Sequence, residues 1–205
     1  MKTNTIAIVR IAGVFACLSL TAVAQSVDAT FINVSPFTQV IGSTDGAATF
    51  RTLPSGVANF DLGPGFCVDP AQVLNAGEKV TFMTQPNSVL PNYEAISRIF
   101  GGYNASSMTS VDAAGAQWAI WEALEDGISS PSFSSGMVQI QNAGSSAVAS
   151  RALDYLNNLG SLPAIDLVYV TNPIRQDMVF VAVPEASGLA LGVLGGVLLM
   201  FRRRR

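Results

Sequence analysis

The sequence predicts an α+β fold that is mainly β: a β sandwich or barrel with an inserted helical subdomain of about three helices. Residues 29–84 and 165–183 are rich in β-branched and aromatic residues and are interrupted by glycine, proline and asparagine, a pattern typical of strands joined by turns. Between these two parts, apolar residues recur at helical spacing. The helices are therefore expected to interrupt a sheet whose strands come from both ends of the domain.

The expected strands fall into two groups. The first group comprises 29–40, 47–52, 57–62, 66–68 and 78–84. Its turns are expected at Gly42, Asp45-Gly46, Pro54-Ser55-Gly56, Gly63-Pro64-Gly65 and Asn75-Ala76-Gly77. The second group is a pair of strands, 165–171 and 177–183, around a turn at Asn172-Pro173.

Three helices are expected between the strand groups. The first spans 93–100 and is closed by Gly101-Gly102, and the third spans 145–158. The second spans 110–126, with Asp112 as its N-cap and Gly127 as its stop.

Both ends of the chain carry targeting patterns. Lys2 and Arg10 precede an apolar stretch at 11–20 and the small residues Ala22-Val23-Ala24, which predicts a secretory signal peptide over 1–24. The alternative is a retained anchor, but ten apolar residues are too few to span a bilayer. We therefore expect one exported domain over 25–182, followed by a separate tail over 183–205.

The tail is an uncharged stretch at 186–201 followed by four arginines, Arg202, Arg203, Arg204 and Arg205. As a helix it would reach about 24 Å, short of the roughly 30 Å of a hydrocarbon core. The arginines would keep that end in the cytoplasm and leave the domain outside. The tail can be interpreted either as a plain membrane anchor or as a sorting signal, and these physical properties do not decide between the two.

Composition excludes several classes of function. Between the two ends stand five basic residues and 13 acidic ones, a net charge of −8, which argues against nucleic-acid binding. Histidine is absent, which removes the usual general base and most zinc sites. We therefore expect no metal, no cofactor and no turnover enzyme.

Cys67 and Gln117 are the candidate functional residues. Removal of the signal peptide takes away Cys17 and leaves Cys67 as a lone thiol in an oxidising compartment. Gln117 shares a helix face with Ala114, Trp121 and Leu124, where an unpartnered amide costs about 1 to 3 kcal/mol. A hydrogen bond from this glutamine to a strand backbone is the simplest answer to that cost.

A thiol and a carboxamide offer a second answer, because they can condense with loss of ammonia to an internal thioester. Such a bond acylates amines or hydroxyls without a histidine. It also needs an apolar shell against water, for which Phe66, Trp118 and Trp121 are candidates. The nearby acids Glu122, Glu125 and Asp126 are interpreted as a solvated helix face, because the spacing of a calcium loop is missing.

Two resemblances extend these expectations. Val183-Pro184-Glu185, the glycine-rich apolar stretch and the terminal arginines resemble the PEP-CTERM sorting signal of Gram-negative bacteria. Phe66-Cys67-Val68-Asp69 and Gln117-Trp118-Ala119-Ile120-Trp121 resemble the paired motifs of bacterial surface thioester domains. The first resemblance implies processing by an exosortase, transient contact with the inner membrane, and release to the cell surface or exterior. The second implies a bond between Cys67 and Gln117.

The expected function is therefore that of an exported cell-surface or matrix protein that attaches covalently to an amine- or hydroxyl-bearing surface ligand or an exopolysaccharide. One alternative is an inert structural protein of the biofilm matrix with the same fold and no thioester. Another is a carbohydrate-binding sandwich, for which the sequence offers only aromatic residues that are equally suited to a core.

Overall fold

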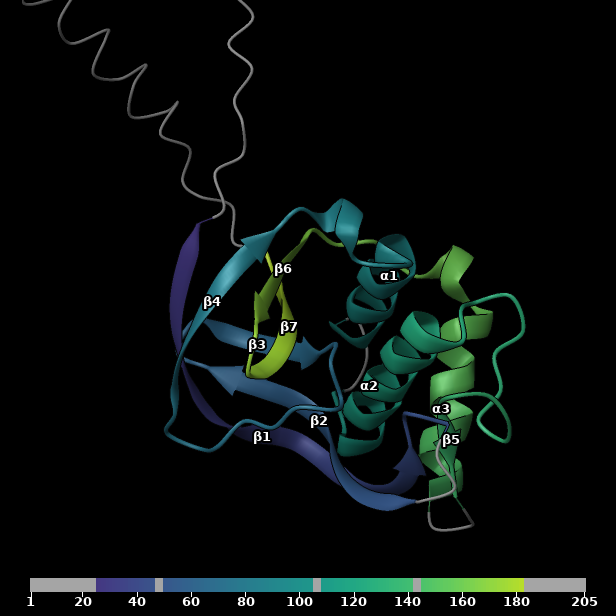
Figure 1. Ribbon diagram of the computed structural model, residues 1–205. Helices are drawn as coiled ribbons and strands as arrows, with labels where there is room; N and C mark the ends of the chain where they lie inside the picture. The colour runs from purple at the N-terminus through teal and green to yellow at the C-terminus, as the bar shows by residue number, and fades with distance from the viewer. Residues whose placement is uncertain (1–24, 47–49, 105–107, 142–144, 183–205) are drawn as a thin grey trace, which may run out of the picture.

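The computed structural model describes residues 25–46, 50–104, 108–141 and 145–182, which form a β half and a helical half (Figure 1). The predicted signal peptide over 1–24 lies outside the described residues. So does the predicted tail, with Val183, Pro184, Glu185 and Arg202 to Arg205. Within the described ranges, no helix has the length and apolar character needed to cross a membrane.

The β half contains seven strands: β1 (Ser26–Ser43), β2 (Arg51–Phe60), β3 (Gly63–Cys67), β4 (Lys79–Gln85), β5 (Gln139–Ile140), β6 (Leu167–Asn172) and β7 (Arg175–Val181). Their order is β2-β3-β7-β6-β4-β1-β5, and all pairings are antiparallel. β1 pairs with β4 through its first residues and with β2 through the rest, so the sheet closes on itself. The predicted fold class is confirmed, and the closure makes the sheet a barrel.

Aromatic side chains fill the barrel. Phe60 lies with its ring centroid 5.4 Å from Phe31, 5.9 Å from Phe82 and 5.2 Å from Phe180. These rings come from β1, β2, β4 and β7, so one cluster joins strands from both ends of the chain. A pocket of about 360 Å³ opens beside them and is lined by Val27, Leu62, Phe82, Val168, Val170, Phe180 and Val181. None of these side chains is titratable or nucleophilic.

The helical half contains α1 (Tyr93–Asn104), α2 (Ser110–Glu125) and α3 (Ser146–Asn157), with short 3₁₀ turns at Asn87–Val89 and Leu159–Ser161. α2 packs between the other two helices and the strands β1 and β2, and every residue from Asp112 to Ala123 is buried. It is therefore buried on all sides rather than along one stripe, and the buried positions include the polar residues Asp112, Gln117 and Glu122. Figure 1 shows it at the centre, between the barrel and α3.

The start of α2 differs from the predicted one. Thr109 is the N-cap, and its hydroxyl accepts a hydrogen bond from the Asp112 N–H. The Asp112 carboxylate in turn accepts one from the Thr109 N–H, which completes a capping box. Asp112 thus caps the helix from its third position, where it also forms an ion pair with Arg151 at 2.7 Å.

Several glycines predicted to make turns instead allow close packing. β2 runs straight through Pro54-Ser55-Gly56, because Gly56 lies against the backbone of Phe37 in β1 and a Cβ would collide there. Gly63-Pro64-Gly65 likewise belongs to β3, and the turn falls at Asp61-Leu62. α1 continues past Gly101-Gly102 to Asn104, since these glycines let the helix touch Pro163 and Leu162. Close packing explains why the turn at Pro54-Ser55-Gly56 and the stop at Gly101-Gly102 were wrong, and Gly65 of β3 likewise packs against Phe180, whereas Gly63 has open space around it.

Candidate functional site

Cys67 is the last residue of β3 and lies at a place where the sheet is incomplete. On one side its neighbours bond to β7, with Val68 N–H donating to Asp177 O at 2.9 Å. On the other side the pairing of β3 with β2 stops at Gly65 and Ala58. The backbone N–H and C=O of Cys67 therefore face away from any strand partner.

Gln117 of α2 fills this place. The Cys67 N–H donates to Gln117 Oε1 at 3.1 Å, and Gln117 Nε2 donates to Cys67 O at 2.7 Å. Both residues are nearly inaccessible, at 6% and 2% exposure. The structure thus brings together the two residues singled out in the sequence, with the carboxamide group held against the cysteine backbone.

The Cys67 sulfur lies in a low-polarity environment. Its thiol donates to the carbonyl oxygen of Asp69 at 3.1 Å. Burial raises the pKa of the thiol far above its usual value, and the nearby Asp69 and Asp177 carboxylates raise the pKa further. The indole N–H of Trp121 acts in the opposite direction, because it favours the thiolate, but it forms no hydrogen bond to the neutral thiol. A free Cys67 is therefore protonated at neutral pH and weakly nucleophilic.

Cys67 and Gln117 both line a pocket of about 140 Å³. The other lining residues are Val34, Arg51, Leu53, Pro54, Gly56, Ala58, Pro70, Ala71, Gln72, Val73, Trp121 and Gln176. Two buried polar atoms among these residues, Trp121 Nε1 and Gln72 Oε1, have no hydrogen-bond partner. The pocket therefore contains two unsatisfied hydrogen-bonding groups beside the Cys67 thiol and the Gln117 carboxamide.

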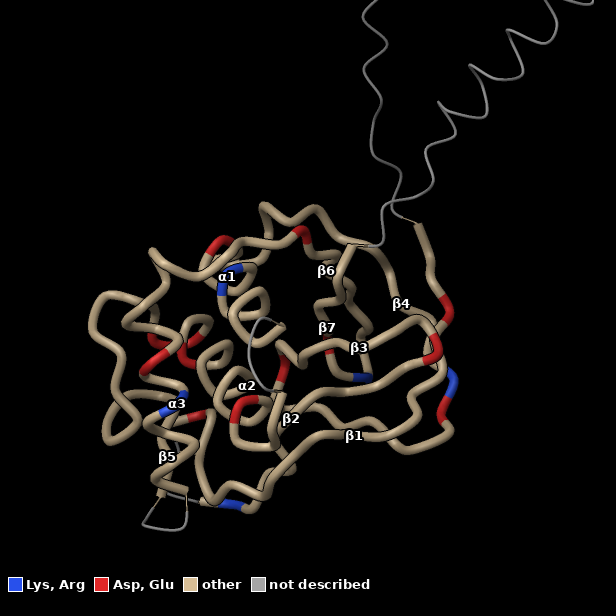
Figure 2. The backbone as a smooth tube through the Cα atoms, turned by 180° about the vertical axis from the view of Figure 1, so that it is seen from behind, with Lys and Arg blue, Asp and Glu red and all other residues tan. Residues whose placement is uncertain are grey.

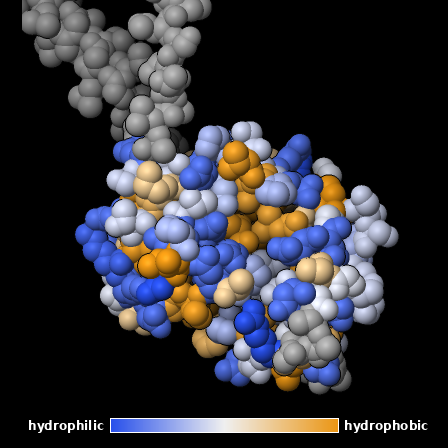
Figure 3. Space-filling view, viewed as in Figure 1, coloured by the Kyte–Doolittle hydropathy of each residue, from blue (hydrophilic) through white to orange (hydrophobic). Residues whose placement is uncertain are grey.

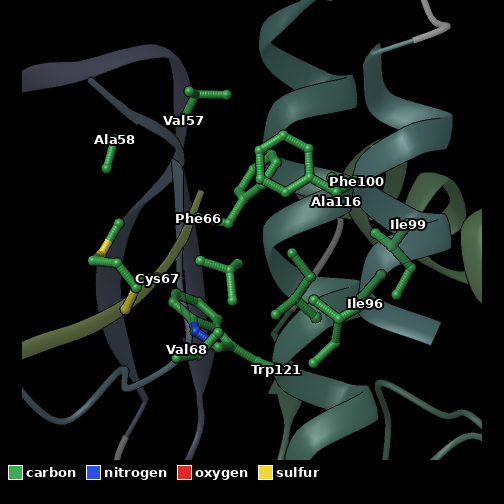
Figure 4. Packing of buried hydrophobic residues seen from close by; sticks show 14 of the residues in the cluster. Val57, Ala58, Phe66, Cys67, Val68, Ile96, Ile99, Phe100, Ala116 and Trp121 are labelled. Carbon is green, nitrogen blue, oxygen red and sulfur yellow. The ribbon is translucent and has the colours of Figure 1, made fainter. Parts of the chain in front are cut away.

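The three predicted shell residues occupy different positions. Trp121 lines the pocket, and Figure 4 shows its side chain extending from α2 beneath Cys67 and Val68. Phe66 instead packs against Phe100, with ring centroids 4.9 Å apart, in the core between β3 and α1. The ring centroid of Trp118 lies 5.2 Å from that of Trp121, and the Trp118 indole N–H donates to Ser55 Oγ at 2.9 Å. Phe66 and Trp118 thus pack behind the pocket wall without lining it.

Arg51, Gln72 and Gln176 also line the pocket, and sequence reasoning did not single them out. Arg51 lies at the start of β2 and its Nη2 donates to Pro70 O at 3.2 Å. Gln72 belongs to the segment after β3 that turns where Asp69 Oδ1 accepts from Ala71 N–H. None of the three residues belongs to a sequence motif, and their segments come together only in the folded chain. No local signal could therefore have singled them out.

The interpretation of the acidic residues as a solvated face is wrong for Glu122, which is only 1% exposed, whereas Glu125 and Asp126 are exposed. Its Oε1 accepts from Ser132 N–H at 2.8 Å, while its Oε2 has no partner. Burial, together with the nearby Asp126 carboxylate, raises the pKa of Glu122 to about 7. Asp126 accepts from the N–H groups of Met137 and Val138. The two acids thus hold the loop between α2 and β5.

Over the described ranges, the structure contains no cluster of three or more His, Cys, Asp or Glu side chains able to hold a metal ion. The pocket lining offers the Cys67 thiol, the carboxamides of Gln72, Gln117 and Gln176, the Trp121 indole N–H and the Arg51 guanidinium. Comparisons with protein-family models, with curated proteins and with solved structures find no match to this chain.

Proposed function

We propose that Cys67 and Gln117 form an internal thioester, and that this exported protein uses the bond for covalent attachment or adhesion at the cell surface or in the extracellular matrix. The observation that supports the proposal most directly is the Gln117 carboxamide, held by two hydrogen bonds against Cys67 inside a pocket. A thioester needs no histidine, metal or cofactor to react.

The bond forms when the Cys67 sulfur attacks Cδ of Gln117. The C–N bond of the carboxamide breaks, and the nitrogen leaves as ammonia with the proton that the thiol gives up. During the attack the carbonyl oxygen gains negative charge. The Cys67 N–H, which already donates to Oε1 at 3.1 Å, is placed to stabilise that charge.

Attachment to a ligand breaks the thioester and frees the Cys67 thiol. An amine or hydroxyl of the ligand attacks Cδ, the C–S bond breaks, and the sulfur takes up the proton that the nucleophile loses. The ligand is then joined to residue 117 through an amide or an ester. Because the pocket is small and both Cys67 and Gln117 are buried, water has little access to the bond before a ligand enters.

The intact mass of the exported protein tests this proposal. We expect wild-type protein to lack one ammonia, and Cys67→Ala and Gln117→Ala to have full mass. Treatment of the wild type with methylamine should add one methylamine and release one thiol. Gln72→Ala is the matched control, because Gln72 lines the same pocket but takes no part in the bond; this variant should keep the mass deficit.

Full mass in freshly isolated wild-type protein, with residue 117 still glutamine, would contradict the thioester. Peptide mapping makes this outcome distinct from hydrolysis, which converts Gln117 to glutamate. It would favour the alternative function, an inert structural matrix protein of the same fold. One observation supports that alternative: the two hydrogen bonds already give the buried amide a complete structural role.

We also propose that an exosortase-like enzyme processes the tail near Val183-Pro184-Glu185. The described domain ends just after β7, where Ala182 N–H donates to Asp166 O at 2.8 Å. Cleavage beyond this point would leave all the described strands in place. Replacing Pro184 and Glu185 by alanine should move the protein from the exterior to the membrane fraction, whereas Ser187→Ala should not. An unchanged distribution would contradict processing at this motif.

A further inference from the structure

We propose that the pocket over Cys67 and Gln117 selects a nucleophile that carries a carboxylate group, and that Arg51 recognises this carboxylate. The inference rests on the proposed thioester and names the class of ligand that reaches it. In chemical terms, the ligand is an amine or hydroxyl with a carboxylate a few bonds away, as in an amino acid or an acidic sugar.

The charges around the pocket support this choice. The domain carries 13 acidic residues and five basic ones, yet Arg51 is the only charged residue among the described residues that line the pocket. The other four basic residues form ion pairs with acids: Lys79 with Asp28, Arg98 with Glu94, Arg151 with Asp112 and Arg175 with Glu78. Figure 2 shows how sparsely Lys and Arg are spread over the described chain. Arg51 is therefore the only cationic group that the described residues place in the lining of this pocket.

Arg51 is placed to meet a ligand at the mouth of the pocket. Its Nη2 donates to Pro70 O at 3.2 Å, and both residues line the pocket, so the exposed guanidinium links β2 to the segment after β3 beside the pocket. This contact uses one of the five N–H groups of the guanidinium. The remaining donors suit the two oxygens of a carboxylate, which arginine binds in a bidentate manner.

The deeper part of the pocket calls for a polar ligand as well. Trp121 is 4% exposed and its Nε1 has no hydrogen-bond partner, and Gln72 Oε1 is buried without one. Such unsatisfied groups are costly unless a ligand or water meets them. Gln72 Oε1 can accept from the N–H or O–H of the nucleophile, and Trp121 can donate to an oxygen. Asp69 and Asp177 lie near Cys67 but do not line the pocket.

Two amines of equal length test the proposal: β-alanine, which carries a carboxylate, and β-alaninamide, which carries a neutral amide there. The rate of adduct formation is followed by intact mass for wild type, Arg51→Gln and Lys79→Gln. Lys79→Gln removes the same unit of charge at a residue that does not line the pocket. The ratio of the two rates is compared between proteins, because the difference in amine basicity then cancels.

We expect Arg51→Gln to lower the β-alanine to β-alaninamide rate ratio about tenfold, while Lys79→Gln leaves it unchanged. The loss should shrink in high salt, because Arg51 lies at the mouth. An unchanged ratio in Arg51→Gln would overturn the role of Arg51 while methylamine still reacts. Failure of methylamine to react with any of the proteins would instead remove the thioester on which the inference rests.

Discussion

Gln117 occupies the position opposite Cys67 that a strand residue would otherwise fill. β2 and β3 pair from Phe60 and Gly63 to Ala58 and Gly65, and two more residues in that register would bring Gly56 opposite Cys67. The pairing stops before that point. One side chain from α2 supplies both hydrogen bonds in its place, and so joins the helical half to the barrel at Cys67.

Gln117→Leu should therefore destabilise the fold even when no thioester is possible. In a Cys67→Ala background we expect a loss of about 2 to 4 kcal/mol in the free energy of unfolding, because the N–H and C=O of residue 67 are left buried and unpaired. Urea denaturation measures this loss. Gln39→Leu, at an exposed position of β1, is the control and should change little.

An unchanged stability of the Gln117→Leu variant would mean that the two hydrogen bonds contribute nothing net. The alternative function, an inert structural protein, explains Gln117 by the stability that these two hydrogen bonds provide. This outcome would therefore weaken that alternative and favour the proposed thioester as the reason for a glutamine at this position.

The fold class was predictable because it depends on local patterns. Alternation and β-branched runs located the strands, and the helical spacing located all three helices to within a few residues of their observed ends. The closure of the sheet was not predictable, because it depends on β1 pairing with both β2 and β4. That arrangement needs one 18-residue strand, whereas the sequence patterns predicted only 29–40 and so left out Ser26, Val27 and Asp28, which pair with β4.

Glycine misled the prediction because it has two uses. Near Pro54 and at Gly101 it was interpreted as a turn or a stop, whereas the structure uses it to bring two backbones together. A single sequence does not distinguish these uses. Arg51 and Gln72 were missed for a related reason: neither stands in a motif, and only the folded chain brings them beside Cys67.

Gly101→Ala should destabilise the protein by about 1 to 3 kcal/mol, because its Cβ would collide with the carbonyl group of Pro163 and push α1 from the segment that precedes β6. Thermal or urea unfolding measures the loss. Gly160→Ala is the matched control, since the space around a Cβ at that position is open. Equal stability of the two variants would show that α1 adjusts without cost.

The Cys67 thiol should react slowly in the folded protein whenever it is free. In a Gln117→Leu variant, which forms no thioester, we expect alkylation of folded protein at pH 7 to be more than about tenfold slower than of urea-unfolded protein. Burial raises the pKa of the thiol and so lowers the thiolate fraction. Adding Trp121→Ala should speed the reaction by opening the pocket wall. Equally fast alkylation of folded and unfolded protein would refute the burial of Cys67.

Hydrophilic side chains cover large parts of the face in Figure 3. Glu122 differs, because it is buried against Ser132 and Asp126 with one oxygen unpartnered. It is therefore the residue at which a change of pH should act most strongly on the free energy of unfolding.

The sign of this effect follows from proton binding. Folding raises the pKa of Glu122 from 4.5 to about 7, so the folded state binds the proton more tightly. The stabilisation is complete below pH 4.5 and is lost as the pH rises through 7. Glu122→Gln mimics the protonated form, so its stability relative to wild type should increase by about 1 to 3 kcal/mol between pH 4.5 and 8. Urea unfolding of both proteins across this range gives the difference, with the exposed Glu125→Gln as control. A difference that does not change with pH would mean that Glu122 keeps its ordinary pKa in the fold.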